Sequence, residues 1–79
     1  MDIVYTEYAE ETIGDRKIGK KEIENSLLNP DEIVQGKKNR KIAHKLFGNK
    51  MLRVVFETEG KTYIVITAYY TQPGRYMHL

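Results

Sequence analysis

The sequence predicts an α+β fold in which two N-terminal helices pack on one face of a mainly antiparallel four-stranded sheet. Helix-type spacing of apolar residues is confined to the N-terminal part of the chain, and strand-type alternation follows from Arg40 to Tyr70. Helices followed by a run of strands are typical of α+β domains, because neither layer can bury its apolar residues alone. The helices should therefore cover one face of the sheet and leave the other exposed to solvent.

The segment from Arg40 to Tyr70 is predicted to form three consecutive antiparallel strands. Residues with turn chemistry, Gly48-Asn49 and Glu59-Gly60, separate them. In the middle strand, one side is apolar and carries Leu52, Val54 and Phe56, while the other side carries Arg53, Val55 and Glu57. In the last strand, Ile64, Ile66 and Ala68 fall on one side, and Tyr63, Val65, Thr67 and Tyr69 fall on the other. We expect one apolar face and one face rich in cationic, aromatic and hydroxyl groups.

The first strand of the three has two interpretations, because apolar residues occur at both parities. If Ile42 and Leu46 point into the core, Lys45 faces solvent; if Ala43 and Phe47 are the buried pair, His44 faces solvent instead. We favour the first interpretation. In the second, His44 would become a candidate acid or base near neutral pH.

The residues before this segment supply the helices and two short strands. Asp2 to Tyr5 is a candidate fifth strand at the sheet edge, and Thr6 is the expected N-cap of a helix from Glu7 to Ile13. A second helix should begin at Gly19 and stop at Asn29-Pro30, because the residue before proline avoids helical angles. Its expected buried stripe consists of Ile23, Leu27 and Leu28. Ile33-Val34 should form a short extended segment.

Length and composition are those of a single small domain spanning residues 1–79. No apolar run approaches the roughly 20 residues that span a bilayer, and the acidic N-terminus does not resemble a signal peptide. We therefore expect a cytoplasmic protein that does not associate with membranes. The chain has no cysteine, which excludes disulfides and thiolate metal sites.

Charge is divided unequally along the chain. Residues 1–32 contain nine acidic and four basic side chains, whereas residues 33–79 contain two acidic and nine basic ones, so the balances of −5 and +7 add to the net +2. A basic half of this kind favours a polyanion as partner. The alternative is a solvated surface whose charges happen to be segregated.

Most catalytic signatures are absent from the sequence. No glycine-rich loop matches a phosphate-binding motif, and His44 and His78 lack the spacing of metal ligands. The single serine, Ser26, falls in a predicted helix, which argues against a serine nucleophile. We therefore expect neither a metal nor another cofactor.

The exposed sheet face is the remaining place for chemistry. With Ile42 and Leu46 buried, Lys45, Arg53 and Tyr69 would lie on adjacent strands of one surface. Two fixed cations can hold a phosphodiester, and a tyrosine can stack on a base or transfer a proton. This is the chemistry of a metal-free ribonuclease, in which a 2′-hydroxyl attacks the neighbouring phosphate. Alternatively, these side chains only keep the exposed face soluble.

Three segments of the chain form a recognisable set: Ile18 to Val34, GKKNRKIAHKLFGNKMLRVVFE and YIVITAYYTQPGRY. Together they resemble a family of small uncharacterised prokaryotic proteins grouped with RelE/ParE-type toxins, and the likeness extends from Thr6 to Tyr76. It is strongest in NPDEIV, LRVVFE and VITAYYT. The resemblance implies a RelE-like fold and an endoribonuclease, often ribosome-assisted, that acts as the toxin of a toxin–antitoxin pair. RNA or the ribosome and an antitoxin protein are the implied partners; the oligomeric state stays open.

The resemblance also implies site residues on the exposed face and at the C-terminal end. The catalytic candidates are Lys45, Arg53, Tyr69 and Tyr76, and the RNA-binding candidates are Lys41, His44 and Arg75. Relatives commonly carry a His-Ala-x-x-Arg pattern on the first helix, where this chain reads Tyr8-Ala9-Glu10-Glu11-Thr12. Whether the protein is an enzyme therefore stays open. The alternatives are a non-catalytic nucleic-acid-binding or protein-interaction module and a gyrase-inhibiting toxin.

Overall fold

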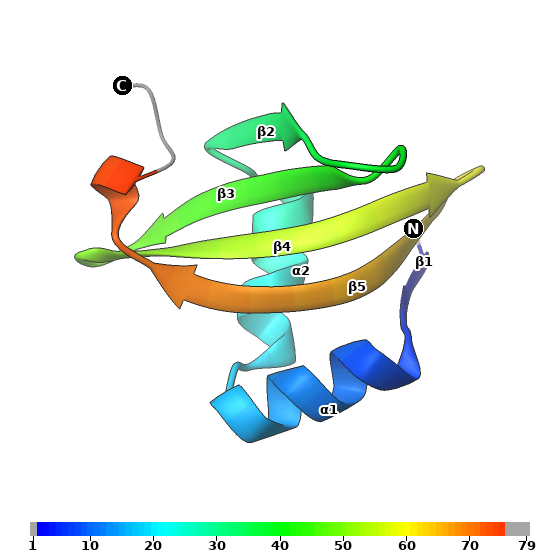
Figure 1. Ribbon diagram of the computed structural model, residues 1–79, viewed down its shortest axis with the longest axis horizontal. Helices are drawn as coiled ribbons and strands as arrows, with labels where there is room; N and C mark the ends of the chain where they lie inside the picture. The colour runs from blue at the N-terminus through cyan, green and yellow to red at the C-terminus, as the bar shows by residue number, and fades with distance from the viewer. Residues whose placement is uncertain (1, 76–79) are drawn as a thin grey trace.

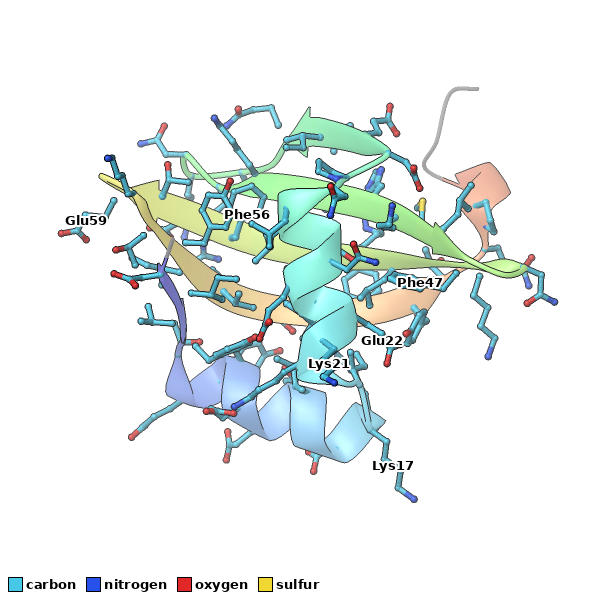
Figure 2. All side chains as sticks on the ribbon, turned by 180° about the vertical axis from the view of Figure 1, so that it is seen from behind. Lys17, Lys21, Glu22, Phe47, Phe56 and Glu59 are labelled. Atoms are coloured by element: carbon cyan, nitrogen blue, oxygen red, sulfur yellow. The ribbon has the colours of Figure 1, made fainter. Side chains whose placement is uncertain are left out.

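Two helices and a five-stranded sheet form two layers in the computed structural model, which describes residues 2–75 (Figure 1). The strands are β1 (Asp2–Tyr5), β2 (Glu32–Gln35), β3 (Lys41–Phe47), β4 (Lys50–Glu59) and β5 (Thr62–Thr71). The helices are α1 (Glu7–Arg16) and α2 (Lys20–Leu28), and a short 3-10 helix, η1 (Pro73–Arg75), follows β5. Seen from behind, α2 crosses in front of the sheet (Figure 2). The α+β class with helices packed on a sheet is thus as predicted.

The sheet order is β1-β5-β4-β3-β2, so β1 and β2 are the two edges. All neighbouring strands are antiparallel except β1 and β5, which run parallel. The candidate N-terminal edge strand is therefore present, and it makes the sheet five-stranded and mixed. Within residues 2–75, neither helix has the length and apolar character needed to span a bilayer.

Local sequence explains where each helix begins and ends. The Thr6 hydroxyl accepts a hydrogen bond from the Ala9 amide at 3.0 Å, as expected of an N-cap. α1 continues past the predicted end at Ile13 to Arg16, because Gly14 weakens a helix without stopping it; Lys17 then closes it with a left-handed φ of 56°. α2 follows the N-cap Gly19 and ends before Asn29-Pro30, as predicted.

The apolar core lies between the helices and one sheet face, which we call the helix-covered face. Its buried residues are Ala9, Ile13, Ile18, Ile23, Leu27, Ala43, Leu52, Val54, Phe56, Val65 and Ala68. The predicted side of the middle strand, Leu52, Val54 and Phe56, is confirmed as core. In α2 the prediction holds for Ile23 and Leu27 but is wrong for Leu28, which is 51% exposed.

The last strand differs from strict alternation because it contains a bulge. Val55 pairs with Thr67 and Phe56 pairs with Val65, so Ile66 has no counterpart on β4. The extra residue reverses the parity of the first half of β5, and Val65 therefore joins the core together with Ala68. The prediction that Val65 lies on the same side as Thr67 and Tyr69 is wrong for this reason.

The turns of the meander follow the predicted chemistry with one shift. Gly48-Asn49 joins β3 to β4, and Gly48 has a φ of +65°. The second turn consists of Gly60-Lys61 in place of Glu59-Gly60, because glycine occupies the first loop position with a φ of +60°.

Candidate functional site

The sheet face opposite the helices, the helix-free face, carries a row of four hydrogen-bonded polar residues. They are direct cross-strand partners: Glu32 pairs with His44, His44 with Arg53, and Arg53 with Tyr69. The His44 Nδ1 lies 3.1 Å from Glu32 Oε2, and its Nε2 lies 3.0 Å from the Arg53 Nη1. Arg53 Nε donates to the Tyr69 hydroxyl at 2.8 Å. We call Glu32, His44, Arg53 and Tyr69 the polar row.

The donor and acceptor inventory assigns the tautomer of His44. A guanidinium has donors and no acceptor, so the contact with Arg53 requires His44 Nε2 to accept. The ring proton then sits on Nδ1 and is donated to the Glu32 carboxylate. A neutral imidazole thus joins an anion to a cation, and each ring nitrogen has a defined role in the row.

Two guanidinium groups lie close to the ring of Tyr69. The Arg53 Cζ is 5.5 Å from the centre of its ring, and the Arg16 Cζ, from the last turn of α1, is 5.8 Å away. Arg16 is fixed by hydrogen bonds from its Nη1 to the Ala68 carbonyl at 2.8 Å and to the Thr67 hydroxyl at 3.2 Å. The α1 helix therefore contributes a cation to the end of the polar row on β5.

Access to solvent differs strongly along the row. His44 is fully buried and Arg53 is 8% exposed, whereas the Glu32 side chain is 26% exposed. Tyr69 is half-buried, and Arg16 beside it is exposed. The two inner members are thus covered, and the groups open to a ligand are Tyr69 and Arg16 at one end of the row and Glu32 at the other.

The surroundings of the row are more apolar than predicted. Cross-strand pairing places Ile42, Leu46, Met51 and Val55 on the helix-free face. Met51 is completely buried, and the other three are half-buried. The expected surface of cations, aromatics and hydroxyls is therefore a single polar row with aliphatic side chains on both sides. In this setting the hydrogen bonds of the row are shielded from bulk water.

The favoured interpretation of β3 is wrong. The alternative is correct about which face each residue lies on, but His44 is fully buried there and does not face solvent. Ala43 pairs with Val54 in the core, so His44 lies on the helix-free face with Arg53. Lys45 pairs with the buried Leu52 and lies on the helix-covered side, where its Nζ donates to the Asn29 carbonyl at 2.8 Å. Lys45 is therefore not on the surface of Arg53 and Tyr69.

The other predicted site residues are distributed as follows. Lys41 pairs with Phe56 and so lies on the helix-covered side of the sheet, exposed at the start of β3. Arg75 is the last residue of η1. Tyr76 lies outside the described residues. Of the predicted set, the polar row brings together His44, Arg53 and Tyr69.

Sequence reasoning missed two members of the site, Glu32 and Arg16. The sequence predicts an extended segment only at Ile33-Val34, whereas β2 begins one residue earlier, at Glu32, which therefore pairs with His44. Arg16 was missed because the first helix was ended too early, before its last turn.

A second polar contact lies on the helix-covered side. The Tyr70 hydroxyl donates to the Glu22 carboxylate of α2. Burial, followed by the hydrogen bond and the charge of Glu22, raises the pKa of Tyr70 from 10.0 to about 12. Lys50, Tyr70, Thr71 and Gln72 line a surface pocket beside it. Among residues 2–75 there is no cluster of three or more side chains suited to a metal ion.

Comparison with known proteins identifies a family but no individual relative. No curated protein and no solved structure matches the chain significantly. A family model described as a domain of unknown function, DUF4258, matches residues 5–70. This match includes both helices and nearly all of the sheet, with every member of the polar row. The chain therefore belongs to the DUF4258 family.

Proposed function

We propose that the protein is a RelE-like, metal-independent endoribonuclease that acts as the toxin of a toxin–antitoxin pair. The observation that supports this best is the polar row on the helix-free face. A carboxylate, an imidazole, a guanidinium and a phenol are aligned there by direct hydrogen bonds, with a second guanidinium at the end. These groups are the ones with which proteins cleave RNA without a metal.

The proposed reaction centres on the Tyr69 hydroxyl. Because the Tyr69 oxygen accepts a hydrogen bond from Arg53 Nε, its own O–H points away from Arg53 and donates no hydrogen bond within residues 2–75. A 2′-hydroxyl of RNA would attack the adjacent phosphorus and lose its proton to water. As the bond from phosphorus to O5′ breaks, Tyr69 would donate its proton to O5′, leaving a cyclic 2′,3′-phosphate and a 5′-hydroxyl.

The arginines would stabilise developing charge, and the buried groups would hold Arg53 in position. Arg16 and Arg53 lie close to Tyr69 and would offset the negative charge that develops on the phosphoryl oxygens. His44 and Glu32 are positioning residues, since His44 is fully buried and holds Arg53 through Nε2. A row fixed by four strands is organised before the substrate arrives, which lowers the cost of reaching the transition state.

Cleavage of a labelled single-stranded RNA, naked and on translating ribosomes, tests the proposal. Tyr69→Phe removes only the hydroxyl, and we expect it to lower the cleavage rate by about 10²-fold or more. Tyr8→Phe, at a 56% exposed tyrosine on α1, should cleave like the wild type. Chelation of divalent ions should leave cleavage of the naked RNA unchanged. Intact RNA in both settings, together with normal growth on expression, would refute the ribonuclease proposal.

The burial of the inner row favours a second candidate function, a non-catalytic RNA-binding module. With 8% of Arg53 exposed and His44 fully covered, these groups can also serve only to hold the strands together. In this case RNA should bind with an affinity that falls as salt rises, and Tyr69→Phe should change neither binding nor the integrity of the RNA.

A further inference from the structure

The turn between β2 and β3 concentrates positive charge that the polar row does not use. Residues 37–40 read Lys-Lys-Asn-Arg, and we call this segment the basic turn. Lys37 and Lys38 are exposed, and no carboxylate among residues 2–75 pairs with them. Arg40 pairs with Glu57 at 3.1 Å, and both side chains of this pair remain about 40% exposed. The basic turn therefore presents several cations to solvent within a very short stretch.

The backbone of the basic turn is tightly defined. Gly36 N donates to the Arg40 carbonyl at 2.7 Å, and Arg40 N donates to the Lys37 carbonyl at 3.1 Å. Lys38 and Asn39 have successive positive φ values of 56° and 65°. Glycine, which has no Cβ, or asparagine, which tolerates the left-handed conformation, ordinarily occupies such positions, because most other side chains are strained there. A lysine at the first of them is costly for the turn, and strain of this kind concentrates at functional sites.

The basic turn leads directly into β3, the strand that carries His44 of the polar row. Arg40 and His44 are four residues apart, about 13 Å at strand spacing. The contact between Arg40 and Glu57 places the Arg40 guanidinium near the helix-free face, since Glu57 pairs with Ile64 on the side of Val55 and Arg53. The half-buried Ile42 and Val55 lie between the turn and the row. A few nucleotides of a single strand cover this span.

We propose that the basic turn binds the sugar-phosphate backbone of single-stranded RNA and leads the strand along β3 to the polar row. This inference rests on the proposed RNA substrate but not on its cleavage. Lysines supply phosphate contacts that carry no sequence information, so the turn would fix the position of the strand rather than its sequence. The aliphatic surface between turn and row would contact bases or riboses.

Binding measured apart from cleavage tests the inference. The probe is a fluorescent single-stranded RNA of about ten nucleotides, made entirely with 2′-O-methyl groups so that no 2′-hydroxyl can attack. Fluorescence anisotropy gives Kd over a series of salt concentrations. The variant K37Q/K38N removes two cations and places asparagine, which tolerates positive φ, at position 38. The matched control K17Q/K21Q removes two exposed lysines from the helical layer, where both are labelled in Figure 2.

We expect K37Q/K38N to bind more weakly and to reduce the slope of log Kd against log salt by about 1.4, at 0.7 for each lost phosphate contact. K17Q/K21Q should retain the wild-type slope. Equal losses in both variants would reduce the effect to net charge and overturn the inference, as would an unchanged slope in K37Q/K38N. Tighter binding of a duplex than of the single strand would overturn it too. If the wild type binds the probe as expected but cleaves no unmodified RNA, the basic turn stands and the ribonuclease proposal falls.

Discussion

On the helix-covered face, strands β3, β4 and β5 present Ala43, Val54 and Ala68 to two helices. The residues next to them in the chain, His44, Arg53 and Tyr69, lie on the opposite face. The first set is buried by apolar packing, which has no preferred direction. The second set is held by hydrogen bonds, which fix the position of each donor and acceptor. The same three strands thus support an apolar core on one face, where packing has no preferred direction, and a set of directional hydrogen bonds on the other.

The largest expected effect concerns the helix-covered face. Leu52 is fully buried, and Leu52→Ala should lower the free energy of unfolding by about 2–5 kcal/mol because it leaves a cavity. A chain of 79 residues has about 4–12 kcal/mol to lose, so a large part of its stability would disappear. Urea denaturation measures this. Leu28→Ala, at a 51% exposed leucine, is the control and should cost less than about 0.5 kcal/mol. Equal losses in the two variants would show that the core is not where the structure places it.

An intermediate effect is expected on the helix-free face. Arg53→Met keeps an apolar stem of similar length but leaves His44 Nε2 and the Tyr69 hydroxyl without their donor. Loss of a hydrogen-bond partner in a shielded site costs about 1–3 kcal/mol. Lys50→Met removes an exposed cation from the same strand and should have little effect on urea denaturation. If both variants unfold at the same urea concentration as the wild type, the polar row does not stabilise the fold.

The smallest effect, at the edge of the helix-covered face, appears only at alkaline pH. Folding raises the pKa of Tyr70 from 10.0 to about 12, so the folded protein retains a proton that the unfolded chain releases. The contribution of Tyr70 to stability is therefore complete below pH 10 and is lost as the pH rises to about 12. The unfolding free energies of the wild type and Tyr70→Phe should converge over this range. A difference between the wild type and Tyr70→Phe that stays constant as the pH rises from 10 to about 12 would contradict the assignment.

The strands and helices could be predicted from the sequence because their signals are local. Alternation in Leu52, Val54 and Phe56, the cap at Thr6 and the stop at Asn29-Pro30 each depend on a few neighbouring residues. These features fixed the layers and most of the element boundaries. The predicted end of α1 at Ile13 is wrong, because a glycine in a helix lowers its stability without deciding where the helix ends.

The faces of β3 and β5 could not be predicted, because they depend on contacts between strands. In β3, Ile42 and Leu46 are as apolar as Ala43 and Phe47, and only the pairing of Ala43 with Val54 decides which pair is buried. In β5, the bulge at Ile66 reverses the alternation halfway along. The error in β3 places Lys45 on the wrong side of the predicted site. Glu32 and Arg16 are absent from the predicted site because the positions of β2 and of the last turn of α1 relative to the sheet follow only from the fold.

The parallel pairing of β1 with β5 has a consequence for biosynthesis. Asp2 pairs with Thr62 and Tyr5 with Val65. The first strand in the sequence, β1, therefore has no hydrogen-bonded neighbour until the last strand, β5, has been synthesised. Closing a loop of this length is slow compared with forming a local hairpin. As the polypeptide emerges from the ribosome, the hairpins that follow α2 can assemble first, and β1 is added when translation has passed β5. The sheet is accordingly completed only near the end of synthesis, and a partner that recognises the complete sheet can bind only after that.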